Sequence, residues 1–545
     1  MISVSSFDDT DSPVHRILSE VFGFAAFRDP QQAVIAHVLA GGDALVLMPT
    51  GSGKSLCYQI PALALDGTAV VISPLIALMQ QQVDHLRALG VAAASLDSTQ
   101  SAPESARIEQ ALLRGEIKIL YVSPERLLMP RCIRLLKRIQ LSLFAIDEAH
   151  CVSQWGHDFR PEYMQLSVLA EIWPTVGRLA LTASATQATA CEILERLALA
   201  PARVFQTSYD RPNIYYQVEA KDDVRQQLTA FVRSRALVGS DAQSTAASGI
   251  VYCASRSRVE MVARWLQQAG FYALAYHAGL ESDERQRRQR QFIEQPGCVM
   301  VATIAFGMGI DKADVRFVAH VDVPRSMEGY FQETGRAGRD GKPATAWMCW
   351  GLDDVARAHR IAGLGQADAI RSRVQREAFQ EMLGFCGNSA CRRQTLLAHF
   401  GESIPACGHC DNCLAAQQDL DVTIPAQKLL SAIYRLWRER DQRYGASHLI
   451  DILRGRLTRR VRELDHQSLS VFGIGQDWSE RQWRRLILQL LGEGVLVMDD
   501  EGYRTLALTS ASVAVLRAER RLRMRAAEIA EGFVEPMVDM PAATG

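Results

Sequence analysis

The chain predicts an α/β fold with two doubly wound parallel sheets in tandem. Short apolar runs alternate with longer amphipathic stretches, and this alternation favours a parallel sheet with helices on both faces. The first series of expected strands lies at residues 44–48, 69–72, 117–122, 143–146 and 178–182. The second lies at residues 214–219, 249–253, 272–276, 299–303 and 315–321. Open parallel sheets bind ligands at the carboxyl ends of their strands, so we expect a ligand site in a cleft between the two lobes.

Length and composition set wide bounds. A chain of 545 residues has room for several domains, each with its own core. The formal net charge is −1, so a nucleic-acid surface has to come from local arginine clusters. Residues 1–11 are acidic and lack the apolar region of a signal peptide, and no apolar run reaches the length of a membrane span. Most of the 12 cysteines are scattered singly, which is typical of a reducing cytosol.

A glycine-rich turn follows the first expected strand and predicts a phosphate cradle. The segment 48–55 reads Met-Pro-Thr-Gly-Ser-Gly-Lys-Ser, which departs from the strict pattern only in having Met48 at a glycine position. Backbone N–H groups of such a turn, and of the helix that follows, point at a triphosphate. Lys54 is expected to reach the β- and γ-phosphates, and the Ser55 hydroxyl to ligate Mg²⁺. The expected nucleotide-binding residues of the turn are Thr50, Gly51, Ser52, Gly53, Lys54 and Ser55.

Two acids follow the expected strand at 143–146. Asp147 is placed to hold Mg²⁺, and Glu148 to orient the attacking water. An exposed acidic turn after a core strand is the alternative. The presence of Lys54 and Ser55 upstream favours the functional interpretation, because both halves of a phosphoryl-transfer site are then present.

Three cysteines near residue 410 break the scattered pattern. Cys407, Cys410 and Cys413 form a double C-x-x-C, which is a compact metal knuckle. A closed tetrahedral zinc site needs a fourth ligand, for which Cys391, Cys386 and His409 compete. Four closed ligands leave no open position, so we expect a structural zinc.

Four further segments carry a family resemblance. The phosphate loop and the Asp-Glu-Ala-His segment at 147–150 are followed by three further segments, at 181–186 (Leu-Thr-Ala-Ser-Ala-Thr), 301–312 and 332–341. Their order along the chain is that of a superfamily 2 helicase. The segment 151–161 (Cys-Val-Ser-Gln-Trp-Gly-His-Asp-Phe-Arg-Pro) looks like the aromatic-rich loop of the RecQ family. The chain therefore resembles the RecQ family of DNA helicases over about residues 15–510.

The resemblance assigns roles to individual residues. The adenine would be bound by Phe24, Arg28 and Gln31, with core packing as the alternative for Phe24. The γ-phosphate side of the site would be completed by Gln332, Arg336 and Arg339. Single-stranded DNA would contact Trp155, Phe159 and Arg160, with inter-lobe core packing as the alternative for Trp155. The family's first zinc ligand matches Cys391.

The resemblance also implies a domain order. We expect a first helicase lobe at 1–208, a second at 209–351, a zinc-binding domain at 352–418, a winged helix at 419–510 and a basic helical tail at 511–545. The winged helix contains a basic run of five arginines: Arg454, Arg456, Arg459, Arg460 and Arg462. With only Glu463 and Asp465 close downstream, we expect the run to be free for duplex phosphates rather than to be merely a solvated helix face. The acidic wing tip at Asp499 and Asp500 would repel phosphates, which argues against a strand-splitting wedge.

These expectations converge on an ATP-dependent DNA helicase that moves 3′ to 5′ and acts in recombination and repair. Polarity and pathway come from the resemblance alone. The expected cofactors are ATP, Mg²⁺ and Zn²⁺, and the expected partners are single-stranded DNA, duplex DNA and single-strand-binding protein. A cytoplasmic, nucleoid-associated location in a bacterium is expected on the same ground. An RNA helicase on the same lobes, or an ATP-gated DNA-binding or strand-annealing protein, are the alternatives.

Overall fold

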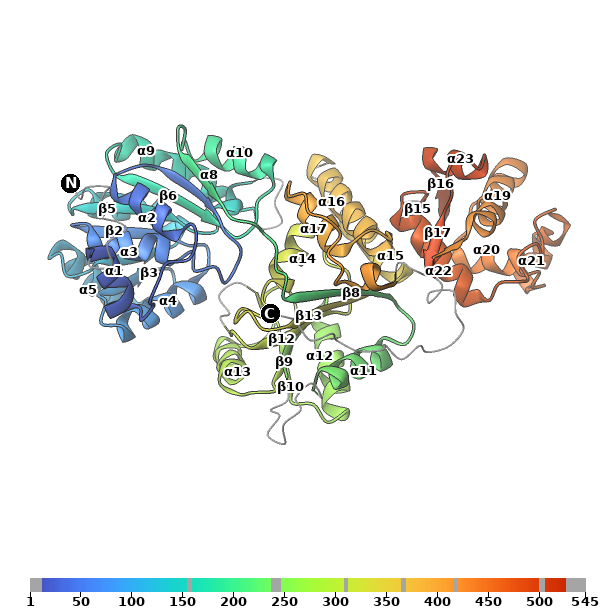
Figure 1. Cartoon of the computed structure of the whole chain (residues 1–545), viewed down its shortest axis with the longest axis horizontal. Coiled ribbons are helices and arrows are strands. Elements are labelled where there is room, and N and C mark those ends of the chain that lie inside the picture. The colour runs from blue at the N-terminus through green and yellow to red at the C-terminus, as the bar shows by residue number, and fades with distance from the viewer. Residues whose placement is uncertain are drawn as a thin grey trace. The chain divides into compact units, whose positions relative to one another are not determined.

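A computed structural model describes residues 12–153, 159–236, 247–307, 312–363, 369–415, 419–498 and 505–525 (Figure 1). The chain forms two compact units. The first contains Met1–Tyr215, Asp223–Trp347 and Leu396–Ile404. The second contains Tyr216–Asp222, Met348–Thr395 and Pro405–Gly545. No helix among the described residues is long and apolar enough to cross a membrane.

A seven-stranded sheet forms the first lobe, in the order β3-β4-β2-β5-β6-β1-β7. All its strand pairs are parallel, as the alternating pattern predicts. Its strands are β1 Ala44–Leu47, β2 Thr68–Ile72, β3 Ala93–Leu96, β4 Ile119–Val122, β5 Leu141–Ile146, β6 Gly177–Thr182 and β7 Arg203–Gln206. The two strands missing from the sequence expectation, β3 and β7, lie at the two edges of the sheet. An edge strand needs fewer apolar residues, and three of the four residues of β7 are exposed.

Helices flank this sheet on both sides (Figure 1). They are α1 Pro13–Arg16, α2 Gln31–Leu39, α3 Leu56–Ala64, α4 Ile76–Ala88, α5 Ala102–Leu113, α6 Pro124–Leu127, α7 Pro130–Leu136, α8 Pro161–Met164, α9 Val168–Ile172 and α10 Gln187–Arg196. Fully buried residues such as Val46, Val71 and Leu181 form the core between sheet and helices. The carboxyl ends of β1, β5 and β6 meet at one edge, which places the phosphate loop beside Asp147 and the 182–186 segment.

A six-stranded sheet forms the second lobe, in the order β10-β11-β9-β12-β13-β8. Its strands are β8 Ile214–Ala220, β9 Ser248–Tyr252, β10 Ala273–Tyr276, β11 Val299–Ala302, β12 Val315–His320 and β13 Ala344–Trp350. Its helices are α11 Val224–Ala236, α12 Arg256–Gln268, α13 Ser282–Glu294 and α14 Met327–Thr334. The five predicted strands are confirmed, and β13 is an addition.

Four helices carry the cysteine knuckle in the second unit: α15 Leu352–Gly363, α16 Ala369–Gly387, α17 Arg392–His399 and α18 Asp411–Ala415. The following domain contains α19 Thr423–Arg440, α20 Ala446–Leu453, α21 Arg459–Glu463, α22 Glu480–Gly492 and α23 Ser510–Leu516. Its wing is the antiparallel pair β15 Leu496–Met498 and β16 Leu506–Leu508. Glycines let α16 and α22 pack closely, because a Cβ on Gly492 would lie 2.9 Å from the Cα of Gly387.

The tail expected to be helical from residue 511 is not a helix over residues 517–525. The helix α23 ends at Leu516, and Arg523–Arg525 forms the strand β17. This strand pairs antiparallel with β14, Asp419–Asp421, at the start of the same domain. Met524 is buried between the exposed Arg523 and the half-buried Arg525, which is close to the alternation of a strand.

Candidate ATP-binding, zinc and DNA sites

The phosphate loop joins β1 to α3. Gly51 and Gly53 have φ of +85° and +83°, a region in which side chains are strained. A Cβ on Gly53 would also lie 2.4 Å from Nε2 of Gln31. Met48 is fully buried in the core, and its backbone oxygen accepts a hydrogen bond of 2.9 Å from Nζ of Lys54. Met48, at the position where the pattern has glycine, is therefore accommodated by packing in the core. Gly51 and Gly53 stand at the two positions of the loop where φ is positive.

The residues expected at the adenine instead hold the phosphate loop together in this structure. The amide of Gln31 donates to the backbone oxygens of Ser52 (3.2 Å) and Gly53 (3.0 Å). Its oxygen accepts from the backbone N–H of Arg28 at 2.8 Å. Nη1 of Arg28 donates to the backbone oxygen of Gly51 at 3.1 Å. The contact of Gln31 and Arg28 with adenine stays a prediction.

Phe24 is not a core residue. Its side chain is half exposed, at 50%, so the core-packing alternative for Phe24 is wrong. An exposed ring that precedes Arg28 and Gln31 in the sequence suits stacking on a base.

The two acids lie next to Lys54. Burial and the charge of Glu148 raise the pKa of Asp147 to about 7, against the opposing charge of Lys54. Burial also lowers the pKa of Lys54 against the opposing charges of Glu148 and Asp147. Lys54 and Asp147 thus lie close enough to shift each other's pKa, and a cation at Asp147 would offset the cost of its buried charge.

A chain of hydrogen bonds runs from the acids to the second lobe. Glu148 has a left-handed backbone (φ 50°), and its Oε2 lies 3.3 Å from Nδ1 of His150. The same Nδ1 lies 2.8 Å from the Thr182 hydroxyl, which donates to the backbone oxygen of Ser184 at 3.2 Å. Nε2 of Gln332, on α14, donates to the Ser184 hydroxyl at 2.9 Å. Serine at 184 therefore serves as a hydrogen-bonding hydroxyl, as its chemistry predicts.

The two arginines predicted to face the γ-phosphate lie in different surroundings. The side chain of Arg339 lies against the phosphate loop, with its Cγ 3.2 Å from where a Cβ on Gly51 would be. Its charge lowers the pKa of Lys54. Arg336 is 7% exposed and lies beside Gly307 and Tyr252 of the second lobe. Its buried Nε has no hydrogen-bond partner among the described residues. The structure thus brings Arg339 to the loop, and contact of Arg336 with phosphate stays a prediction.

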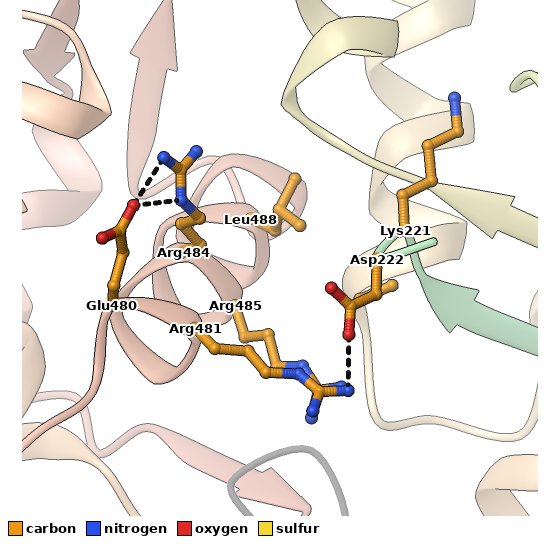
Figure 2. A pocket seen from close by; sticks show the side chains of 8 residues that line it. Lys221, Asp222, Glu480, Arg481, Arg484, Arg485 and Leu488 are labelled. Carbon is orange, nitrogen blue, oxygen red and sulfur yellow. Dashed lines mark hydrogen bonds and ion pairs between the residues drawn. The ribbon is translucent and has the colours of Figure 1, made fainter. Parts of the chain in front are cut away.

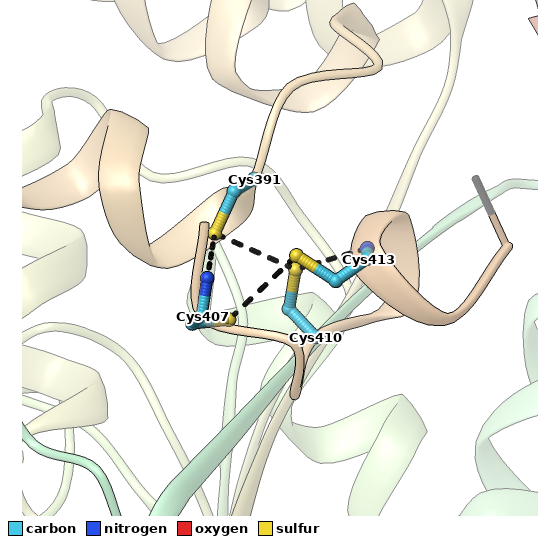
Figure 3. A group of neighbouring side chains, drawn as sticks. All are labelled: Cys391, Cys407, Cys410 and Cys413. Atoms are coloured by element: carbon cyan, nitrogen blue, oxygen red, sulfur yellow. Dashed lines mark hydrogen bonds between the residues drawn. The ribbon is translucent and has the colours of Figure 1, made fainter. Parts of the chain in front are cut away.

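Four cysteine sulfurs converge on one point (Figure 3). The sulfurs of Cys391, Cys407, Cys410 and Cys413 all lie within 4.8 Å of one another. The separations are 3.9 Å for Cys407–Cys413 and 4.0 Å for Cys391–Cys410. Tetrahedral Zn–S bonds place sulfurs roughly 3.8 Å apart, so the four sulfurs fit zinc without rearrangement. Neither Cys386 nor His409 belongs to the group.

Burial disfavours the charged form of three of these thiols. Burial opposes ionisation of Cys391, but backbone N–H groups of Cys407 and Gln394 lower its pKa to about 7. Burial raises the pKa of Cys410 to about 11 and that of Cys407 as well. Four thiolates at this point therefore need a metal to balance their charge.

The sequence matches four protein-family models, one after another along the chain. They are the DEAD/DEAH box helicase (residues 28–193), the helicase conserved C-terminal domain (231–341), the RecQ zinc-binding domain (352–414) and the RQC domain (416–531). The chain is 44% identical over 510 residues to the ATP-dependent DNA helicase RecQ of Pasteurella multocida, covering 93% of this chain and 78% of that protein. The chain belongs to the RecQ family of ATP-dependent DNA helicases.

More distant likenesses agree with this family. The RecQ helicase of Bacillus subtilis is 36% identical over 522 residues, covering 94% of this chain and 86% of that protein. A solved structure of the DEAD-box helicase Mss116, bound to single-stranded RNA and UDP-BeF, aligns with a TM-score of 0.55 and 15% identity. That alignment covers 72% of this chain and 91% of the other, and it supports the tandem helicase fold.

The RecQ aromatic loop, residues 151–161, is described only at its two ends, 151–153 and 159–161. Trp155 lies outside the described residues, as does the wing tip with Asp499 and Asp500. Phe159 is half-buried, and Nη1 of Arg160 lies 3.7 Å from a carboxylate oxygen of Glu125. The DNA contacts predicted for this loop stay predictions.

Several arginines of the basic run in the winged helix already have partners within the domain. Arg456 pairs with Glu480 at 2.7 Å and with Asp451 at 3.5 Å. Arg459 pairs with Glu463 at 2.6 Å. The guanidinium of Arg460 lies over the ring of Tyr444 at 5.2 Å. The premise that only downstream acids were near is therefore wrong, because Asp451 lies upstream and Glu480 is brought in by α22.

A second basic cluster in this domain is also paired. Figure 2 shows a pocket beside α22 in which Arg484 turns to Glu480 and Arg481 turns to Asp222. The distances are 2.8 Å and 2.9 Å. These paired arginines carry less net charge toward a phosphate than their number implies.

A buried ion pair beside the zinc cysteines escaped sequence reasoning. Arg392 is fully buried, and its Nε lies 3.1 Å from a carboxylate oxygen of Asp411. Asp411 also accepts from the backbone N–H of Val218 at 3.0 Å and lies 3.5 Å from Nη1 of Arg525. The available signal was position, because Arg392 directly follows Cys391 and Asp411 directly follows Cys410. Asp411 thus joins the knuckle to β8 and β17.

Proposed function

We propose that the protein is an ATP-dependent 3′–5′ DNA helicase that couples hydrolysis to translocation on single-stranded DNA and to duplex unwinding. The observation that carries the proposal is the placement of Arg339, from the second lobe, against the phosphate loop of the first. An arginine supplied across a cleft stabilises the charge of the transferring phosphoryl group. Hydrolysis in one lobe is thereby linked to the position of the other. Polarity, and action in recombination and repair, rest on the kinship with RecQ proteins.

The residues divide the chemistry as follows. Lys54 binds the phosphates once ATP displaces its bond to the backbone oxygen of Met48. Ser55 and Asp147 would hold Mg²⁺, which neutralises charge on the phosphates and positions them. Glu148, fixed beside His150, orients the attacking water. Gln332, on α14 of the second lobe, donates a hydrogen bond to Ser184 of the first lobe and so links α14 to this site.

The remaining domains are assigned to DNA and to architecture. A zinc held by four cysteines has no open position and braces the platform. Arg454, Arg456, Arg459 and Arg460 are proposed to contact duplex phosphates, and Trp155, Phe159 and Arg160 to contact a single strand. Single-strand-binding protein is proposed as a partner, and the cytoplasm at the bacterial nucleoid as the location.

Strand displacement on two matched substrates tests the proposal. A duplex with a 3′ single-stranded overhang should be unwound with ATP and Mg²⁺, and a duplex with a 5′ overhang should not. Lys54→Ala should bind DNA yet release no phosphate, and Glu148→Gln should bind nucleotide without hydrolysis. Phosphate release that DNA does not stimulate would favour an ATP-gated binding or annealing protein. Unwinding of RNA duplexes in preference to DNA would favour an RNA helicase.

A further inference from the structure

The linker between the two helicase lobes contains a fully buried tyrosine that touches both lobes. The hydroxyl of Tyr209 donates to the backbone oxygen of Ala185, in the first lobe, at 3.3 Å. Its ring packs edge-on against Phe331 of α14, in the second lobe, with centroids 5.7 Å apart. Ala185 directly follows Ser184, and Phe331 directly precedes Gln332. Tyr209 therefore contacts the neighbours of both partners in the Gln332–Ser184 hydrogen bond.

A short turn after α17 holds this tyrosine in place. The ring of Phe400 lies 4.9 Å from the rings of both Tyr209 and Phe331 and is 3% exposed. One carboxylate oxygen of Glu402 accepts the backbone N–H of Tyr209 at 2.6 Å. The other accepts the Ser208 hydroxyl at 2.7 Å. An acceptor with full charge makes these bonds stronger than neutral ones. We call Phe400, Glu402 and Tyr209 the linker bracket.

The bracket belongs, in sequence, to the zinc-binding segment. Phe400 and Glu402 lie between the zinc cysteines Cys391 and Cys407, whose sulfurs are within 4.8 Å of each other. Residues Leu396–Ile404 nevertheless pack in the first unit, with the helicase lobes. The metal site thus closes a loop whose ends are fixed at the sulfurs and whose middle holds the linker. Closing a loop lowers the entropy cost of ordering its middle.

We propose that the linker bracket positions the two helicase lobes, so that the zinc-binding segment governs how DNA-stimulated hydrolysis follows cleft opening. Opening the cleft has to change the Gln332–Ser184 contact, and Tyr209 is a linker residue that contacts the sequence neighbours of both partners. Glu402 and Phe400 act through Tyr209 and do not touch the reacting atoms, so they are positioning residues. The inference rests on the proposed helicase function.

Hydrogen exchange tests the bracket without relying on activity. The backbone N–H of Tyr209 donates directly to Glu402, so its exchange should be slow in the native protein. Glu402→Ala should speed exchange in the linker peptide containing residues 207–213, and Glu402→Gln, which keeps an acceptor oxygen, should restore most of the protection. Glu377→Ala is the matched control, because it removes an exposed pair with Arg373 on α16. Unchanged exchange in the linker of Glu402→Ala would overturn the bracket.

Hydrolysis tests the coupling. In Glu402→Ala we expect the DNA-stimulated rate to fall on the order of tenfold, while the rate without DNA and the zinc content stay unchanged. Equal loss in Glu377→Ala, or full stimulation in Glu402→Ala, would overturn the coupling. If Glu402→Ala loses zinc, Ser208→Ala carries the test from outside the zinc-binding segment, and unchanged exchange and stimulation there would overturn it. Native protein without any DNA stimulation would contradict the proposed function, whereas the exchange measurement would still decide the bracket.

Discussion

Arginines are used differently in the second helicase lobe and in the winged-helix domain. Arg336 is buried, with 7% of its surface exposed, and Arg339 lies against the phosphate loop. They are the two arginines of the segment 332–341. The side chain of Arg459 is 91% exposed and paired with its neighbour Glu463, within a run of five arginines. Two of the five arginines in the denser cluster, Arg456 and Arg459, thus already pair with acids. The position that the backbone imposes on an arginine matters more than the number of arginines nearby.

The turn that carries the lobe arginines is fixed by the linker. The guanidinium of Arg211 donates to the backbone oxygens of Gly335 (3.1 Å), Ala337 (2.8 Å) and Gly338 (2.9 Å). The side-chain amide of Asn213 donates to the oxygens of Gly338 (2.8 Å) and Lys342 (2.9 Å). A turn with its carbonyls satisfied in this way holds its side chains ready for a ligand, which lowers the cost of reaching the transition state.

Removing Arg339 should give the largest effect. Arg339→Ala should lower the rate of DNA-stimulated hydrolysis by about 10³-fold or more, the range seen when an arginine at the transferring phosphoryl group is lost. Arg339→Lys should not restore the rate, because an ammonium lacks the planar fork of donors. Arg459→Ala, the exposed control, should hydrolyse normally. Steady-state phosphate release measures all three, and near-normal turnover in Arg339→Ala would contradict the contrast between the two regions.

Disturbing the turn itself should have an intermediate effect. Gly338 has φ +57°, and a Cβ there would lie 2.8 Å from the Lys342 oxygen and 2.4 Å from Nδ2 of Asn213. Gly338→Ala should destabilise the protein by more than about 1 kcal/mol and lower hydrolysis, because strain and the contact with a backbone oxygen add.

Gly341→Ala is the control for this substitution, because Gly341 has φ +77° with nothing within 4 Å of the added Cβ. It should show the backbone strain alone. Thermal unfolding and phosphate release separate the two, and equal losses in both variants would show that contacts around Gly338 do not matter.

Neutralising the winged-helix run should have a smaller effect. Changing Arg456, Arg459 and Arg460 to alanine would flatten the slope of log affinity against log salt by roughly 2.7 if all three bound phosphates freely. We expect a smaller change, since Arg456 and Arg459 already pair with acids. Glu463→Gln together with Glu480→Gln should instead steepen the slope by freeing these arginines. Duplex binding at several salt concentrations measures both, and a full change of roughly 2.7 would show that the ion pairs give way to DNA.

The smallest expected effect is on acid stability. Burial, then the charges of His466 and Arg460, lower the pKa of His448 from its usual 6.5 to about 4. The unfolded chain therefore binds a proton that the folded domain excludes, and the free energy of unfolding should fall as pH drops from about 6.5 toward 4. Above this window the contribution is fully present.

Two variants check the origin of this sensitivity. Arg460→Gln should raise the pKa of His448 and narrow the window, because one of the opposing charges is gone. His448→Gln should remove this titration altogether. Thermal unfolding of the full chain across this pH range measures the difference. A pH profile of His448→Gln identical to that of the native protein would show that His448 does not cause the sensitivity. An unchanged profile in Arg460→Gln alone would show that the charge of Arg460 does not act on His448.

The sequence by itself determined the parts of this protein whose chemistry is local. The glycines of the 48–55 loop, the acids after β5 and the spacing of Cys407, Cys410 and Cys413 each need only a few consecutive residues. Their backbone angles and ligand spacing can therefore be predicted from the order of residue types along the chain. The alternation of strands and helices could also be predicted from the sequence. Edge strands such as β7 were the exception, because they lack an apolar pattern.

Only the tertiary structure decided the contacts between distant segments. It brought Glu480 to Arg456 and placed Glu402 on Tyr209. It also left Cys386 out of the group of four sulfurs, which agrees with the match of Cys391 to the family's first ligand. It also showed Gln31 bonded to the phosphate loop. The physical reason is that such pairs depend on how strands and helices pack, and side chains separated by tens or hundreds of residues meet only after the elements between them have folded.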